Sequence, residues 1–160
     1  MQMREVAATA GVALATIYRY FSSKDHLLAA AMTEWASQLR TRVQEEPPEG
    51  TTPADQLAEL FKRACRAMER QPKLSMALVR ALSAADPGVN ESSGAVRDQI
   101  ASMGDGILRD LDPEIRTEIF AVIGHVWYST LVGWANGRHD FDWVIIQLER
   151  AVHVLVDPHY

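Results

Sequence analysis

Apolar residues recur along most of the chain at intervals of three and four, a spacing that places them on one face of an α-helix. No stretch shows the strict alternation of apolar and polar residues that marks a half-buried strand. The pattern therefore predicts an all-α fold. We expect helices near residues 4–10, 14–20, 24–44, 53–70, 73–84, 93–110, 113–136 and 141–156.

Two polar stretches interrupt this helical pattern. Residues 45–50 hold two prolines and a glycine, and residues 86–94 combine proline and glycine with serine and asparagine, a composition typical of flexible loops. Side chains that can cap a following helix stand at Thr52, Asp112, and either Asp140 or Asp142. We place a domain boundary at the first break, between an N-terminal segment with its connecting helix (residues 1–44) and a larger helical domain (residues 45–160).

Composition adds constraints on location and partners. The chain has 160 residues, 48% of them hydrophobic, which is enough for one sizeable core. It contains no apolar run long enough to span a membrane, no secretion signal, and a single Cys65, so we expect a cytoplasmic protein without disulfides. The net charge is −5, yet residues 1–24 carry three basic side chains against one acidic. This distribution suits a protein that meets phosphates at one end only.

The most specific feature is a pair of short helices joined by a turn at Gly11. In the second helix, Leu14, Ile17 and Phe21 recur at helical spacing and form an inward stripe. The opposite face carries hydroxyls, aromatic rings and a positive charge, which a recognition helix offers to the major groove of DNA. These candidate DNA-binding residues are Thr16, Tyr18, Arg19 and Tyr20. An ordinary helical hairpin with core aromatics is the alternative.

A candidate phosphate contact follows this second helix. Ser22 or Ser23 can cap the next helix, and Lys24 then stands in its first turn beside free backbone N–H groups. Such an arrangement can hold a phosphate and fix the register of a protein on DNA. We therefore add Lys24 to the candidate DNA-binding residues.

The order of these residues resembles the helix-turn-helix signature of the tetracycline-repressor family. The resemblance rests on Arg4-Glu5-Val6-Ala7, Ala10-Gly11-Val12, Thr16-Ile17-Tyr18-Arg19-Tyr20-Phe21, Ser23-Lys24 and Leu27-Leu28. It implies that Thr16, Tyr18, Tyr20 and Lys24 face DNA. It also implies an Ω-shaped homodimer that binds a palindromic operator and releases it when a ligand binds.

The chain departs from the family pattern at three places. Ala13 replaces the usual serine cap of the recognition helix, a loss of about 1 kcal/mol on the general capping scale. Ala15 stands where glycine is common. The family also places one more helix ahead of the position of Met1, so the resemblance implies an incomplete DNA-binding domain. We therefore expect poor DNA binding by the 160-residue chain.

The helices that follow carry soft and aromatic side chains at helical spacing, which can form either a close-packed core or a pocket. The candidate ligand-binding residues are Trp35, Leu39, Phe61, Cys65, Met68, Leu78, Met103, Ile107, Trp127 and Leu131. A basic run comprises Arg63, Arg66, Arg70 and Lys73. It is either a solvated helix face or an entrance that meets an anionic ligand.

Within the family, the chain resembles the actinobacterial repressors of steroid (cholesterol) catabolism. This resemblance runs through the first 28 residues and through residues 66–74 and 125–131. It implies a small hydrophobic effector, such as a steroid-like coenzyme A thioester, and an operator that is a short inverted repeat.

The last two helices present long apolar faces that exceed the need of a single chain, so we expect them to pair across a two-fold axis as a four-helix bundle. The predicted interface residues are Val122, Val126, Trp134, Val144, Leu148, Val152 and Leu155. A monomer that buries both faces internally is the alternative.

Two other functions remain as alternatives. One is a helical dimerisation module without DNA binding, and the other is an all-α enzyme. No glycine-rich phosphate loop appears, and Glu149 and His153 lack the additional carboxylates of a diiron bundle. We therefore expect no metal, no cofactor and no catalytic residue.

Overall fold

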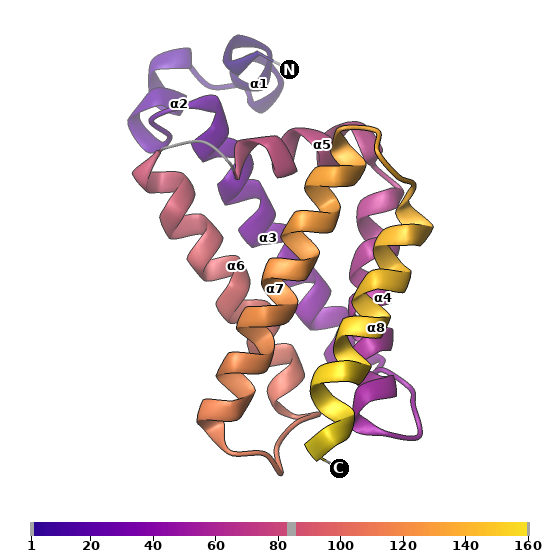
Figure 1. Cartoon of the computed structure of the whole chain (residues 1–160). Helices are drawn as coiled ribbons and strands as arrows, with labels where there is room; N and C mark the ends of the chain where they lie inside the picture. The colour runs from indigo at the N-terminus through magenta and orange to yellow at the C-terminus, as the bar shows by residue number, and fades with distance from the viewer. Residues whose placement is uncertain (1, 83–85, 160) are drawn as a thin grey trace.

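A computed structural model describes residues 2–82 and 86–159, and its helical content confirms the all-α prediction (Figure 1). No strand occurs within those ranges, and no helix there is long and apolar enough to cross a membrane. The helices are α1 (Met3–Ala10), α2 (Leu14–Tyr20), α3 (Lys24–Glu45), α4 (Pro53–Glu69), α5 (Pro72–Ala81), α6 (Pro87–Asp105), α7 (Pro113–Ala135) and α8 (Phe141–Val156), followed by a short 3₁₀ turn, Asp157–His159.

Capping side chains set where several helices begin. Thr52 and Asp55 form a reciprocal capping box, in which the Thr52 hydroxyl accepts from the Asp55 N–H at 3.1 Å and the Asp55 carboxylate accepts from the Thr52 N–H at 3.0 Å. Asp140, rather than Asp142, caps α8 by accepting from the Trp143 N–H at 2.9 Å. Ala13 leaves α2 without a side-chain cap, as the sequence indicates.

The prediction of a flexible loop at residues 86–94 is wrong, because α6 begins at Pro87. Asp86 caps α6 by accepting from the Gly88 N–H at 2.8 Å, and Pro87 occupies the first helical position, where its fixed φ suits a helix. Val89 is fully buried, which anchors the first turn to the core. Packing and capping thus override a loop-like composition. The predicted helix at 73–84 ends at Ala81, and residues 83 and 84 lie outside the described part of the chain.

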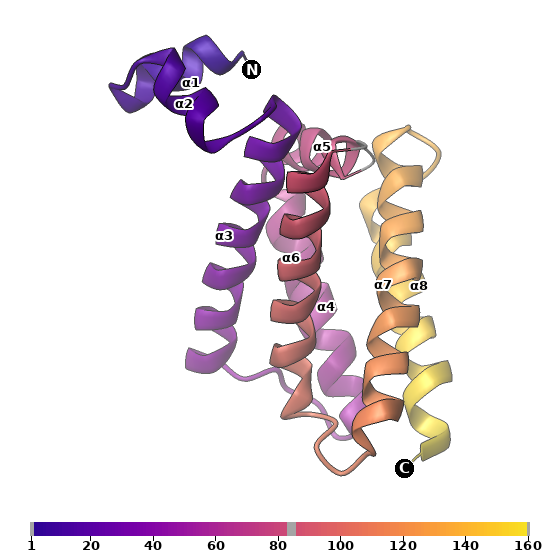
Figure 2. The same ribbon diagram turned by 90° about the vertical axis from the view of Figure 1, so that its left-hand side faces the viewer.

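The body of the molecule, α3 to α8, is a helical bundle. α3 packs on α5 and α6, while α8 packs on α4 and α7. Figure 2 shows α3 on one side of the bundle and the α7–α8 pair on the other, with α4 and α6 between them. The central core is apolar and closely packed, and Leu57, Ile123 and Leu148 are among its most deeply buried side chains.

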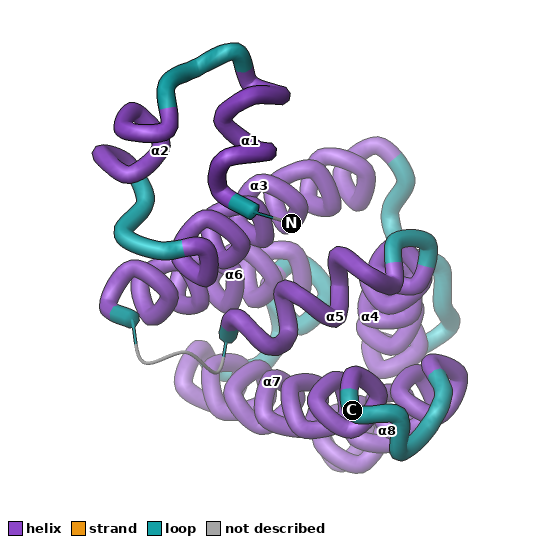
Figure 3. Tube along the Cα trace, turned by 90° about the horizontal axis from the view of Figure 1, so that it is seen from above, coloured by secondary structure: helices purple, strands orange, loops and turns teal. Residues whose placement is uncertain are grey.

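The N-terminal helices α1 and α2, which we call the head, form a separate small unit. Met3, Ala7 and Ile17 make up its buried cluster, with Phe21 and Leu27 packed against it. Viewed from above, the head sits over the α3–α6 side of the bundle and away from α7 and α8 (Figure 3). The polypeptide leaves the head directly into α3.

Candidate DNA-reading head and effector pocket

The turn of the head depends on one glycine. Gly11 ends α1 with φ +67°, in the left-handed region that side chains with a Cβ rarely adopt, and its N–H closes the last turn of α1. This turn brings α2 back so that Ile17 packs on Met3 and Ala7. The inward stripe that the sequence predicts is therefore present.

The outward side of α2 holds the predicted DNA-binding residues. Tyr18 and Tyr20 are 52% and 62% exposed, Thr16 is half-buried, and Lys24 is exposed in the first turn of α3. Arg19 donates to the Tyr20 hydroxyl at 3.2 Å and lies 5.1 Å from the centre of its ring. The head therefore offers aromatic hydroxyls and positive charge to a polyanion.

A polar junction ties the head to α6. Ser23 caps α3 by accepting from the His26 N–H at 3.0 Å, and its hydroxyl donates to Asp86 at 2.7 Å. The Ser22 hydroxyl donates to the same carboxylate at 3.1 Å. The hydrogen bond from Ser23 is the largest cause that holds the pKa of Asp86 below its ordinary value. Gly88 lies so close to the His26 ring that no side chain fits between them.

A cavity of about 220 Å³ opens between α3, the end of α4, and α5. Its lining residues are Ala31, Met32, Trp35, Gln38, Arg42, Ala67, Met68, Arg70, Gln71, Leu74, Ser75 and Leu78. Ser75 is buried and donates to the Met68 carbonyl at 2.7 Å, which fixes the start of α5 against the end of α4. We call this cavity the α3–α5 pocket.

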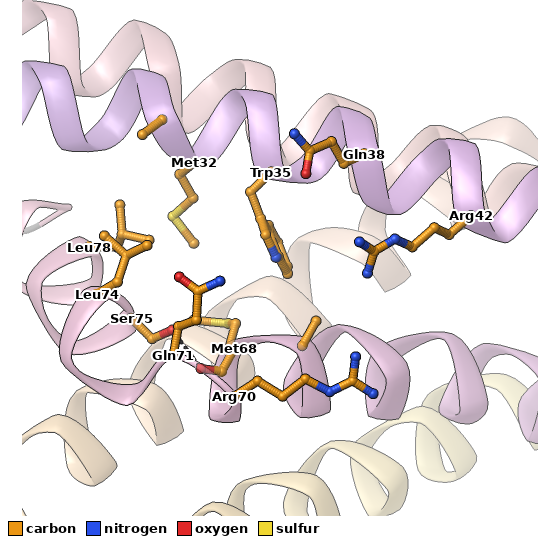
Figure 4. Close-up of a pocket in the computed structure, with 12 residues that line it drawn as sticks. Met32, Trp35, Gln38, Arg42, Met68, Arg70, Gln71, Leu74, Ser75 and Leu78 are labelled. Atoms are coloured by element: carbon orange, nitrogen blue, oxygen red, sulfur yellow. Dashed lines mark hydrogen bonds between the residues drawn. The ribbon is translucent and has the colours of Figure 1, made fainter. Parts of the chain in front are cut away.

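The α3–α5 pocket is apolar at one end and basic at the other (Figure 4). Met32 and Leu78 form the apolar end, Trp35 stands in the middle, and Arg42 and Arg70 flank the far end. The predicted basic run does not act as a unit. Arg63 is bound to Glu59, and Arg66 is bound to Glu69 and Asp142, while Arg70 lines the pocket.

The structure brings three predicted ligand-binding residues to this pocket: Trp35, Met68 and Leu78. The others pack in or against the central core and do not line it: Leu39, Phe61, Cys65, Met103, Ile107, Trp127 and Leu131. Phe61 and Trp127 meet edge to face at 5.4 Å, and burial raises the pKa of the Cys65 thiol to about 12. The stripes point to the centre of the bundle, which the chain fills with its own side chains.

Sequence reasoning missed four polar residues of the pocket, Gln38, Arg42, Gln71 and Ser75. A signal for two of them exists, because Gln38 and Arg42 stand three and seven residues after Trp35 and so share its face of α3. Polar side chains that continue an apolar stripe mark the place where a helix face leaves the core.

A second hollow, of about 440 Å³, lies at the opposite end of α4 near the C-terminus of α8. Its polar lining includes Asp55 and His153, and His153 also contacts Asp157 at 3.1 Å. The described residues contain no group of three or more His, Cys, Asp or Glu side chains that could hold a metal. This hollow also has no part of α3 in its lining, so the α3–α5 pocket is the better candidate for a site that communicates with the head.

The structure corrects part of the predicted dimer interface. Val144, Leu148 and Val152 are buried within the single chain, because this side of α8 packs on α4 and α7. Val126, Trp134 and Leu155 are half-buried against the same core. Val122 is the most exposed of the predicted interface residues, with 41% of its surface accessible to solvent. The remaining exposed apolar side chains on α7 and α8 include Ile115, Trp143, Ile146 and Val154.

A helix-turn-helix head carried on a helical bundle defines a one-component DNA-binding regulator, and the comparisons with known proteins identify its family. Residues 1–31 match the family model described as bacterial regulatory proteins, tetR family. Residues 50–155 match the model described as the tetracyclin repressor-like C-terminal domain. The chain belongs to the tetR family of transcriptional regulators.

The chain is similar to the HTH-type transcriptional repressors KstR of Rhodococcus jostii and Mycobacterium tuberculosis. Each is 35% identical over 98% of this chain, which spans 73% and 71% of their respective lengths. Because these relatives are repressors, the chain is a regulator of transcription and not an enzyme.

Two crystal structures share the fold. A TetR transcriptional regulator from Rhodococcus sp. RHA1 superposes with a TM-score of 0.86 at 27% identity, over 98% of this chain and 84% of that one. Thermus thermophilus FadR, a TetR-family repressor in complex with lauroyl-CoA, superposes with a TM-score of 0.76 at 20% identity, over 100% and 85%.

Proposed function

We propose that this protein is a cytoplasmic, dimeric repressor that binds a palindromic operator and releases it when a small hydrophobic or coenzyme A-linked effector binds. One observation carries this proposal. α3 begins at Lys24, directly after the recognition helix, and the same helix lines the α3–α5 pocket from Ala31 to Arg42. A ligand that moves α3 therefore moves the head.

The proposed effector is an acyl or steroid-like coenzyme A thioester in lipid catabolism. The similarity to the KstR repressors supports the steroid variant, on the resemblance described above. The lauroyl-CoA that FadR holds supports an acyl thioester as the first ligand to try. The apolar lining of the pocket includes Met32 and Met68. It suits either an acyl chain or a steroid ring system, because methionine adapts to varied shapes.

The junction at Asp86 gives the body a second hold on the head. Asp86 both caps α6 and accepts from Ser22 and Ser23 at the start of α3. Displacement of α3 relative to α6 therefore has to break or rearrange these hydrogen bonds. We propose that they favour one orientation of the head and that the effector shifts the balance between two orientations.

The proposed dimer uses the outer side of α7 and α8, around Val122, Trp143 and Ile146. These apolar side chains are 40–43% exposed in the single chain, and a second copy would cover them. Two heads can then reach half-sites one helical turn apart, about 34 Å, or a multiple of that distance. Sedimentation of the Val122→Asp and Ile146→Asp variants tests the surface. Dissociation to monomers is expected, and an unchanged dimer in both would exclude this surface.

The decisive experiment is fluorescence anisotropy on DNA from the region upstream of the gene. It uses the 160-residue chain and, in parallel, a chain extended upstream in frame, each with and without lauroyl-CoA and a steroid-CoA thioester. We expect tight, salt-sensitive binding that a thioester releases. Binding that no thioester affects would remove the effector class. No binding by either chain would favour a dimerisation module instead.

Two lysine variants sharpen this experiment. Lys24→Ala removes a proposed phosphate contact and should weaken binding to all DNA sequences. It should also reduce the slope of log affinity against log salt concentration by about 1. Lys62→Ala is the matched control, because Lys62 is an exposed lysine on α4 whose recorded ion pair is with Glu59 of the same helix. Equal effects of the two substitutions would contradict the assignment of Lys24 to the DNA interface.

A further inference from the structure

We infer that the α3–α5 pocket selects an amphipathic anion, whose apolar body lies against Met32, Trp35 and Leu78 and whose negative group is held between Arg42 and Arg70. This inference rests on the proposed function for the location of the effector site. It goes further by naming the charge that the effector carries and the two side chains that recognise it.

The first support is the polarity of the pocket along its length. The apolar end is lined by residues of α3 and α5, and the two guanidinium groups come from α3 and from the end of α4. Arg42 and Arg70 therefore approach the same end from different elements, and Trp35 lies between that end and the apolar one (Figure 4). A ligand with one apolar and one anionic end matches this gradient in a single orientation.

The second support is that the guanidinium groups of Arg42 and Arg70 are not paired with carboxylates in the part of the chain that the structure describes. Arg63 and Arg66 are neutralised by carboxylates, including Asp142 from α8 at 2.7 Å. Across residues 2–82 and 86–159, neither Arg42 nor Arg70 has a side-chain ion pair or hydrogen bond. A carboxylate or phosphate can accept charge-assisted hydrogen bonds from both guanidinium groups without breaking an existing contact.

The third support is the size of the cavity. Its volume of about 220 Å³ is below the roughly 300–1,000 Å³ typical of pockets that enclose a drug-sized ligand. The pocket can therefore take the apolar part of a larger molecule, while the remainder leaves past the arginines. Such an exit lets a thioester place its coenzyme A phosphates at Arg42 and Arg70, and the carboxylate of a fatty acid would end at the same place.

Calorimetry with four probes of known charge tests the inference: laurate, dodecanol, lauroyl-CoA and free coenzyme A. Laurate and dodecanol share a twelve-carbon chain and differ in the anionic group. We expect an anionic probe with an acyl chain to bind roughly tenfold or more tightly than dodecanol, with an affinity that falls as salt is raised. Binding of laurate without lauroyl-CoA assigns a carboxylate, and the reverse assigns the coenzyme A phosphates.

Arginine variants test the two named side chains. Arg42→Gln and Arg70→Gln should each weaken the anionic probe roughly tenfold and leave dodecanol unaffected. Arg40→Gln is the matched control, since Arg40 is an exposed arginine on the same helix that does not line the pocket. Dodecanol as tight as the anions, or an equal loss in Arg40→Gln, would overturn the inference. If a variant fails to fold, the salt dependence of probe binding by the wild-type chain still tests the inference. Affinity for the anionic probe that does not fall as salt is raised would overturn it.

Failure of this inference and failure of the proposed function give different results. Calorimetry needs no DNA, so charge-dependent binding without operator release would leave the pocket assigned and remove the effector mechanism. Operator release that is the same in wild type, Arg42→Gln and Arg70→Gln would retain the mechanism and reject the anion site.

Discussion

The head and the body of this regulator are built on opposite principles. The body buries an extended core in which Leu57, Ile123 and Leu148 are at most 1% exposed. The buried cluster of the head consists of Met3, Ala7 and Ile17, and two of these three side chains retain 8–9% exposure. A small core means that the head can open locally at low cost while the body stays folded.

The two regions also display their functional groups differently. Tyr18 and Tyr20 stand in solvent, where a nucleic acid can reach them, whereas Trp35 is half-buried at the edge of the main core. The proposed DNA-binding residues therefore lie on an exposed surface, and the proposed effector site lies at the boundary of the packed core. α3 belongs to the body and packs against the core of the head through Leu27, so we propose that it is the element through which the two regions communicate.

The largest expected effect contrasts a core leucine of the body with a core isoleucine of the head. Leu57→Ala should lower the free energy of unfolding by about 2–5 kcal/mol, because it leaves a cavity in a fully packed site. All four tryptophans lie in the body, so tryptophan fluorescence in urea reports that loss. Ile17→Ala should leave the urea midpoint of tryptophan fluorescence unchanged. It should instead abolish the protection of backbone amides in α1 and α2 from hydrogen exchange. A lowered tryptophan midpoint in Ile17→Ala would show that head and body unfold together.

An intermediate effect contrasts two glycines of α6. A Cβ at Gly88 would lie 2.6 Å from the His26 ring, so Gly88→Ala has to displace that ring or separate α6 from α3 and should cost about 1–3 kcal/mol. A Cβ at Gly94 meets only the end of Arg97, at 3.8 Å, so Gly94→Ala should stabilise the helix by up to about 1 kcal/mol. Thermal melts of both variants check the opposite signs. Two changes of the same sign would contradict the described contact at His26.

The smallest expected effect concerns pH. Hydrogen bonds hold the pKa of Asp86 (chiefly from Ser23) and the pKa of Asp55 (chiefly from Thr51) below the ordinary value of 3.8. A depressed folded-state pKa contributes stability above the unfolded value, and that stability is lost as the pH falls through the lowered value. Acidification below pH 3.8 should therefore weaken the head junction through Asp86 and the cap of α4 through Asp55.

Asn variants assign these two pH effects. Asp86→Asn should remove the pH dependence of amide protection in the head, and Asp55→Asn should remove part of the pH dependence of the tryptophan midpoint in the body. If each substitution altered both readouts equally, the separation of head and body would have to be abandoned.

The fold was largely predictable from the sequence because helical spacing, capping residues and proline positions agree along most of the chain. The exception is the start of α6, where Pro87 and Gly88 indicate a loop if the contacts of Val89 and His26 are unknown. Those contacts are long-range, and a local pattern cannot contain them.

The head was more predictable than the pocket for a physical reason. Thr16, Tyr18 and Lys24 belong to one short ordered segment, so their spacing alone defines the motif. Arg42 and Arg70 come to one pocket only after the chain has folded back from α3 to the end of α4. The apolar stripes that suggested a cavity around Phe61 and Trp127 pack against each other, and neither of these two residues lines the α3–α5 pocket.

The most direct test of the account is the release of bound operator by lauroyl-CoA in the Arg42→Gln/Arg70→Gln double variant and in Arg40→Gln. Anisotropy is measured against the effector-free binding of each protein, with the chain extended upstream in frame. The account predicts that the double variant needs at least roughly tenfold more lauroyl-CoA for half-release, while Arg40→Gln follows wild type. Superimposed release curves for all three proteins would contradict it.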